Sequence, residues 1–119
     1  MIAHHQIETR PWLAETAISD IEARYPDCAV LKMRGDCMCP TIREDDYALI
    51  DLRQTRFRED DIYALQEPGG HVLVRRVQRI FAVSGWVRIA CDNPRYDSHD
   101  LELMELTIVG RICAIVQRR

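Results

Sequence analysis

The chain of 119 residues is long enough for one domain with a single core, and its 47% hydrophobic and 29% charged residues argue against a wholly disordered protein. The formal net charge of −3 argues against a free nucleic-acid binder, which would carry a strongly basic face. A short stretch is nevertheless rich in arginine, and we interpret it as a solvated strand surface: Arg75, Arg76, Arg79 and Arg88.

The five cysteines are odd in number, and the N-terminus lacks the pattern of a signal peptide, which argues against a secreted disulfide framework. No stretch approaches the roughly 20 apolar residues that cross a bilayer. We therefore expect a cytoplasmic protein with reduced thiols, no membrane partner and no cofactor. A metal site at Cys37 and Cys39 would need further ligands, such as Cys91 or His71, so no metal is expected.

The first residues divide into a polar segment and a helix. Residues 1–10 are interpreted as a polar tail, in which His4 and His5 are solvated, and residues 11–119 as a single domain. Apolar residues then recur every four positions up to Arg24, and Pro11 suits the first turn of a helix. The sequence thus predicts a helix over 11–24, which ends at the turn 25–27.

The rest of the chain predicts short strands. Apolar and β-branched runs indicate strands over 29–33, 47–51, 61–65, 71–77, 86–91 and 106–116. The turn Pro68-Gly69-Gly70 joins two of them into a hairpin, and Gly110 marks a possible bulge in the last. This pattern predicts a mostly β domain with mainly antiparallel strands and one short N-terminal helix.

One segment carries chemical information. Residues 33–42 read Met-Arg-Gly-Asp-Cys-Met-Cys-Pro-Thr-Ile. This closely resembles the active-site signature of the LexA and phage-repressor family of self-cleaving serine peptidases, in which a serine stands between Gly-Asp and Met. The matching positions are Gly35, Asp36, Met38, Pro40 and Thr41, and Cys37 stands where the family has its serine.

Five further segments resemble the same family in the same order. Residues 44–51 and 60–65 resemble its next two strands, and 73–77 resembles the strand that carries the catalytic lysine, with Arg75 in the lysine's place. Residues 91–96 resemble the Ser-Asp-Asn-Pro-x-Tyr segment of phage repressors, and 108–112 resembles their final strand. The resemblance implies a LexA-like C-terminal domain, with short strands in a partly open, barrel-like arrangement.

Both catalytic positions differ from the family. In the family a neutral lysine accepts the serine proton, whereas an arginine stays protonated and cannot be a general base. Three interpretations remain open: a degenerate peptidase, a cysteine peptidase in which Arg75 favours the Cys37 thiolate, and a thiol sensor that uses Cys37 and Cys39. If Arg75 is buried it needs a partner, for which Asp36 and Asp92 are candidates.

The resemblance also implies a regulatory role. Family domains dimerise partly through their last strand and so space two DNA-binding heads. We therefore expect a homodimer, DNA contact only through a separate helix-turn-helix domain, and a protein regulator as a further candidate partner. The predicted interface lies in the last strand: Ile108, Ile112, Ala114 and Val116.

Overall fold

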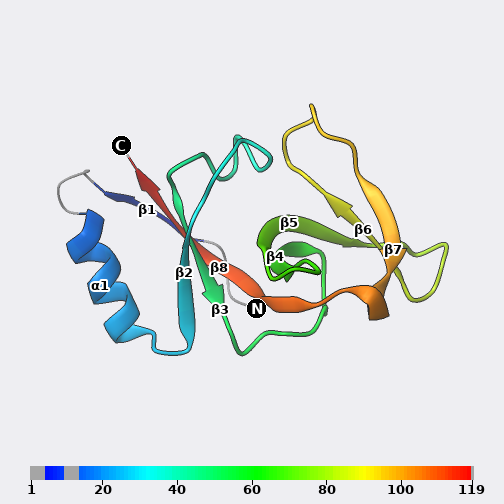
Figure 1. The fold of residues 1–119 in the computed structure, drawn as a ribbon, viewed down its shortest axis with the longest axis horizontal. Coiled ribbons are helices and arrows are strands. Elements are labelled where there is room, and N and C mark those ends of the chain that lie inside the picture. The colour runs from blue at the N-terminus through cyan, green and yellow to red at the C-terminus, as the bar shows by residue number, and fades with distance from the viewer. Residues whose placement is uncertain (1–4, 10–13, 119) are drawn as a thin grey trace.

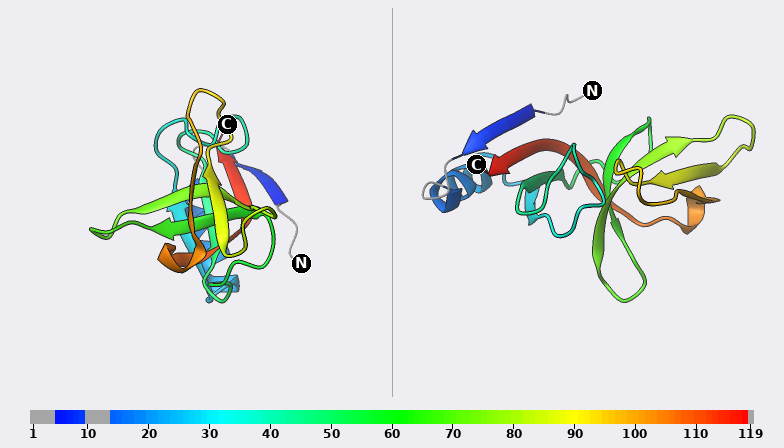
Figure 2. Two further views of the ribbon diagram at one scale, coloured as in Figure 1. Left: turned by 90° about the vertical axis from the view of Figure 1, so that its right-hand side faces the viewer. Right: turned by 90° about the horizontal axis from the view of Figure 1, so that it is seen from above.

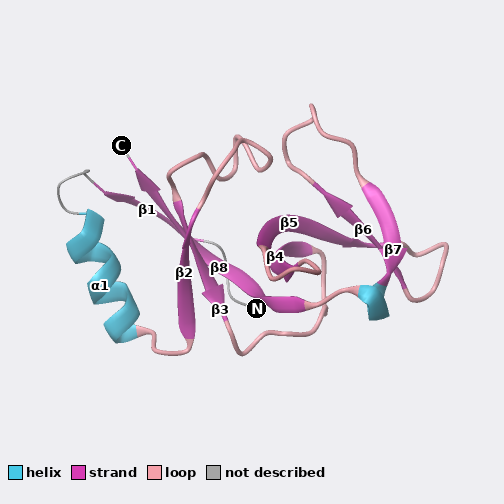
Figure 3. Ribbon diagram, viewed as in Figure 1, coloured by secondary structure: helices cyan, strands magenta, loops and turns pink. Residues whose placement is uncertain are grey.

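The fold is described from a computed structural model, and the description covers residues 5–9 and 14–118. One helix, α1 (Ala14–Arg24), lies at one end of an elongated molecule of 47 × 31 × 29 Å, and strands make up most of the rest (Figures 1 and 3). The strands are β1 (His5–Thr9), β2 (Cys28–Lys32), β3 (Tyr47–Asp51), β4 (Asp61–Gln66), β5 (Val72–Arg79), β6 (Trp86–Ala90), β7 (His99–Glu102) and β8 (Ile108–Arg118).

The strands form an open sheet in the order β2-β3-β8-β4-β5-β6-β7, and every pair along this path is antiparallel. The predicted mostly β, mainly antiparallel class is therefore confirmed. The hairpin of β4 and β5 is also confirmed, and it projects from the body of the molecule (Figure 2). Gly69 and Gly70 lie in its turn with φ of +104° and +93°, a region that favours glycine.

The last strand, β8, runs through the middle of the sheet. It pairs with β3 on one side, and on the other side with β4 near its beginning and with β1, in parallel, near its end. The register against β4 shifts between Gly110 and Ile108, which places a bulge beside the predicted position. A Cβ atom on Gly110 would collide with the backbone of Asp51, so glycine is required for this close approach.

Three elements differ from the sequence prediction. Residues His5–Thr9, which were interpreted as part of a polar tail, form β1. Strand β7 was not predicted, because its exposed, charged residues lack an apolar alternation, and backbone pairing with β6 defines it instead. A short 3-10 helix, Leu103–Glu105, follows it. The first predicted helical residues, 11–13, lie outside the described residues.

The core has three clusters. The first lies beneath the segment 33–42, whose Met38 and Ile42 are almost fully buried against Ile62, Val74 and Ile112. The second packs Tyr63 and Val77 on the opposite face of the β4–β5 hairpin, and the third packs Leu49 and Val116 near α1. The motif residue Met38 is thus a packing residue that anchors its loop.

Candidate functional site

The segment that carries the family motif is a loop between β2 and β3, held at both ends. At its base, Met33 N–H donates to the Asp46 carbonyl at 2.8 Å and Asp45 N–H donates to the Met33 carbonyl at 2.9 Å. Gly35 has a φ of +76°, which turns the chain, and the exposed Pro40 follows a cis peptide bond. The side chain of Met38 fixes the loop to the core, so Cys37 is presented from an anchored loop.

The segment after β6 lies against this loop. Asn93 N–H donates to the Cys37 carbonyl at 3.0 Å, and Asn93 Nδ2 donates to the Asp36 carbonyl at 2.9 Å. The Tyr96 hydroxyl donates to the Asp36 carboxylate at 2.5 Å. Three hydrogen bonds thus join two segments more than 50 positions apart, both of which carry the sequence resemblance to the family.

Asp92 ties the same two segments to β5. It accepts a hydrogen bond from Thr41 Oγ1 at 2.6 Å and two from the Arg76 guanidinium at 2.7 and 2.8 Å. The two-pronged contact with Arg76 lowers the pKa of the Asp92 carboxyl. The carboxylate is therefore charged at neutral pH and holds the loop, β5 and the segment after β6 in one arrangement.

Cys37 and Arg75 line the same cleft, which has a volume of about 320 Å³. Its walls come from the end of β2 with the motif loop, from the beginning of β5, and from Tyr96. The half-buried Arg75 side chain donates to the Val74 carbonyl at 2.8 Å. The two residues that the sequence resemblance assigns to catalytic positions, distant in sequence, therefore line one cleft.

Neither Asp36 nor Asp92, the two candidates from the sequence, pairs with Arg75, whose side chain donates to the Val74 carbonyl instead. Asp92 pairs with Arg76, and Asp36 binds Tyr96 and lies 3.7 Å from the guanidinium of Arg95. Arg76 pairs with Asp92 because successive side chains of a strand point to opposite faces of the sheet. The side chain of Arg76 therefore points toward Asp92, and that of Arg75 points away from it.

The sulfur of Cys37 contacts a second thiol. Cys91 Sγ donates to Cys37 Sγ over 2.9 Å. Burial, followed by this hydrogen bond, raises the pKa of the Cys91 thiol to about 11, so Cys91 keeps its proton at neutral pH. The sequence places a cysteine in the serine position of the phage-repressor segment, but nothing in its pattern indicates that the two thiols touch.

The four residues predicted at a dimer interface contribute to the packing of the domain itself. Ile112 and Val116 are fully buried, Ala114 is 8% exposed, and Ile108 is half-buried against the second core cluster. The physical reason is the central position of β8, whose side chains pack against both neighbouring layers. Ile112, Ala114 and Val116 are therefore core residues, Ile108 keeps part of its surface exposed, and the dimer interface stays a prediction.

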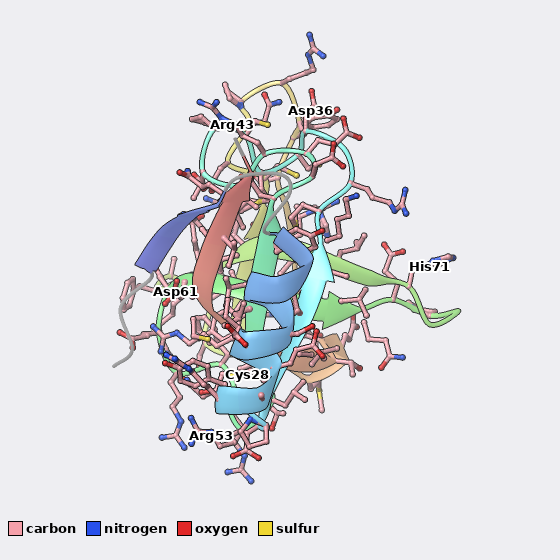
Figure 4. All side chains as sticks on the ribbon, turned by 90° about the vertical axis from the view of Figure 1, so that its left-hand side faces the viewer. Cys28, Asp36, Arg43, Arg53, Asp61 and His71 are labelled. Atoms are coloured by element: carbon pink, nitrogen blue, oxygen red, sulfur yellow. The ribbon has the colours of Figure 1, made fainter. Side chains whose placement is uncertain are left out.

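Neither a membrane helix nor a metal cluster is found in the part of the chain described. None of its helices is long and apolar enough to cross a membrane. Within the same residues, no group of three histidine, cysteine, aspartate or glutamate side chains is placed to hold a metal ion. His71, considered with the cysteines as a ligand, is exposed in the β4–β5 turn region (Figure 4).

A comparison with protein families agrees with the fold and with the motif loop. The model described as Peptidase S24-like matches residues 2–113. The chain belongs to the Peptidase S24-like family. A search of curated proteins found no match. Family membership supports the LexA-like and peptidase-like fold, and the match covers both Cys37 and Arg75.

Proposed function

We propose that this chain is the regulatory domain of a LexA-like or phage-type repressor whose peptidase centre lacks a general base. Family membership supplies the class of protein, and the cleft supplies the chemical argument. The domain would dimerise in the cytoplasm, act on DNA only through a separate helix-turn-helix domain, and respond to a protein regulator.

The observation that carries the proposal is the arginine in the cleft. Self-cleavage in this family needs a neutral amine that takes the proton of the nucleophile. Arg75 lines the cleft at that position, and its guanidinium donates to the Val74 carbonyl. Because a guanidinium stays protonated at any ordinary pH, Arg75 cannot take a proton from Cys37.

A cysteine peptidase is the second candidate, because a thiolate needs no base. A cation beside a thiolate stabilises it, and Arg75, which lines the cleft together with Cys37, is the cation that such a mechanism would use. The leaving amine of a peptide bond would still need a proton donor. The contact of Cys37 with the Cys91 thiol occupies the nucleophile and favours the first candidate.

Self-cleavage in a chimera separates the two candidates. A family-type linker with its cleavage site is fused to the N-terminus, and the native pair is compared with Cys37→Ser combined with Arg75→Lys at alkaline pH. We expect the restored serine–lysine pair to cut and the native pair to remain intact. Cys39→Ser combined with Arg76→Lys is the matched control, since it makes the same changes next to the two positions, and it should not cut.

Each other result has a definite meaning. Cutting by the native pair would show that Cys37 is a working nucleophile and would contradict the degenerate centre. Failure of the serine–lysine pair would contradict the assignment of Cys37 and Arg75 to the catalytic positions. Analytical ultracentrifugation tests the dimer separately, and a monomer at micromolar concentration would favour a domain that docks to a different partner.

A further inference from the structure

We propose that Cys37 and Cys91 are a peroxide-reactive thiol pair, in which Cys37 is oxidised and Cys91 then closes a reversible disulfide. The site is the cleft described above, but the inference does not rest on the repressor role or on the loss of peptidase activity. It rests on the placement of two sulfurs by a rigid set of contacts.

The two sulfurs are already close. They lie 2.9 Å apart, and a disulfide bond is about 2.05 Å long, so bond formation needs a movement of about 1 Å. The backbones on both sides are fixed next to each other, because Asn93 donates to the carbonyls of Asp36 and Cys37. The hydrogen bonds of Asn93 therefore keep the two thiols side by side, and we expect a small side-chain rotation to bring the sulfurs to bonding distance.

The hydrogen bond between the thiols assigns their roles. Cys91 donates its proton toward Cys37, so Cys37 is the sulfur whose lone pairs face a donor. Cys37 also lines the cleft, whereas Cys91 is not among the residues that line it. Cys37 is thus the sulfur that meets an oxidant from solvent, and Cys91 is the resolving thiol.

The chemistry balances with a hydroperoxide as the oxidant. The Cys37 thiolate attacks one oxygen of the peroxide; a sulfur–oxygen bond forms, the oxygen–oxygen bond breaks, and the departing alkoxide or hydroxide takes a proton from water. The Cys91 sulfur then attacks the Cys37 sulfenic acid, a sulfur–sulfur bond forms, and hydroxide leaves with the Cys91 proton as water. The two sulfurs lose two electrons together, and the peroxide gains them.

The other cysteines have different surroundings. Cys39, which the sequence pattern paired with Cys37, lies two residues along the same loop, a spacing that disfavours an unstrained direct bond. Cys28 and Cys113 also contact each other, but they lie in the sheet, and burial raises the pKa of Cys113 to about 12. The structure thus selects Cys91, and neither Cys39 nor Cys113, as the partner of Cys37.

The disulfide would change the cleft in two ways. It would remove Cys37 as a free nucleophile, and it would tie the motif loop covalently to the segment after β6. Dithiothreitol would reverse both changes, since the bond is a simple thiol–disulfide couple.

Peptide mapping after treatment with hydrogen peroxide tests the proposal. The reduced full chain is oxidised, quenched by alkylation and digested under non-reducing conditions. We expect the intact protein to lose two hydrogen atoms and the peptides of Cys37 and Cys91 to appear as one cross-linked species that dithiothreitol separates. In Cys91→Ser the cross-link is lost, and Cys37 accumulates as a sulfenic acid that dimedone traps.

Two matched variants complete the test. Cys39→Ser and Cys113→Ser each remove a neighbouring thiol and should leave the Cys37–Cys91 cross-link unchanged. A Cys37–Cys39 or Cys28–Cys113 cross-link as the main product would overturn the proposal, as would direct conversion of Cys37 to a sulfinic acid in the native chain. Because these readouts are masses of defined peptides, they are independent of the cleavage assay and of the oligomeric state.

Discussion

This molecule contains two pairs of cysteines whose thiols contact each other, and the two pairs have different surroundings. Cys37 and Cys91 meet at a cleft, where a loop contacts the segment after β6. Cys28 and Cys113 meet within the sheet, on the strands β2 and β8 that flank β3. Figure 4 labels Cys28 near one end of the view and Asp36, the neighbour of Cys37, near the other.

The difference between the pairs lies in the cleft, which Cys37 lines, and in what each sulfur contacts. The Cys113 thiol also donates to the Leu49 carbonyl at 3.6 Å, and burial is the main reason that its pKa rises to about 12. Burial likewise raises the pKa of Cys28. A thiol held protonated in a sheet is a packing group, whereas a thiol at a cleft beside a cation is a reactive one. From this comparison we expect environment, and not proximity of two cysteines, to decide reactivity.

The largest expected difference is in alkylation. Near pH 7, a pKa of about 12 gives Cys113 about a thousandfold smaller thiolate fraction than the ordinary value of 9.0 would. Iodoacetamide should therefore label Cys113 at least about tenfold more slowly in the native chain than in the chain unfolded in urea, and Cys37 should be labelled well before it. Time-resolved mass spectrometry of the labelled peptides measures both rates, and earlier labelling of Cys113 would refute the contrast.

The next effect is the stability of the oxidised protein. Cys37 and Cys91 are 54 positions apart, and a cross-link over that length stabilises a domain by about 4 kcal/mol in the chain-entropy model. The oxidised chain should therefore melt roughly 15 °C above the reduced chain in differential scanning calorimetry. Cys91→Ser should show no difference between the two conditions. An unchanged or lower melting temperature in the cross-linked chain would mean that the bond strains the loop.

A third prediction concerns the carboxylate that joins the segments at the cleft. Asp92→Ala breaks the contacts with Arg76 and Thr41 and leaves a half-buried guanidinium without its partner, which should cost about 3 kcal/mol. Asp100→Ala is the matched control, because Asp100 makes the same two-pronged contact with Arg88 on the exposed surface. Urea unfolding should show a large loss for the first variant and little change for the second. Equal losses would mean that the cleft does not depend on Asp92.

The smallest expected effect is the pH dependence of stability that comes from the buried carboxylate of Asp51. Asp51 is 1% exposed, and hydrogen bonds, first from Arg53 and then from Gln54, help lower its pKa from 3.8 to about 2. Its contribution of about 2 kcal/mol is therefore present above about pH 4 and is lost as the pH falls through about 2. Asp51→Asn should flatten the pH dependence of unfolding in that window.

The same substitution acts on the second thiol pair. The Asp51 carboxylate raises the pKa of both Cys28 and Cys113, so Asp51→Asn should lower the pKa of Cys113 and speed its alkylation. Cys37 alkylation should stay unchanged and serves as the internal reference. A change at Cys37 of the same size would indicate general loosening of the fold.

The sequence predicts most of the elements, because apolar alternation and turn residues are local signals. The strands 47–51 and 61–65 and the hairpin that follows agree with the structure within a residue or two. Strands β1 and β7 were missed because backbone pairing defines them, and not an alternation of their own residues: β1 pairs with the distant β8, and β7 pairs with the preceding β6. The motif loop was identified by resemblance, and the structure brings Cys37 and Arg75 to one cleft.

By itself, the sequence determined the family and the mostly β fold, since motifs and alternation are properties of neighbouring residues, and it predicted two altered positions at Cys37 and Arg75. Only the tertiary structure decided that Asp92 pairs with Arg76, that the apolar residues of β8 belong to the core, and that Cys91 meets Cys37. These contacts join segments that are tens of residues apart. These contacts form only when the whole sheet bends and packs, and no local sequence pattern predicts how the sheet does so.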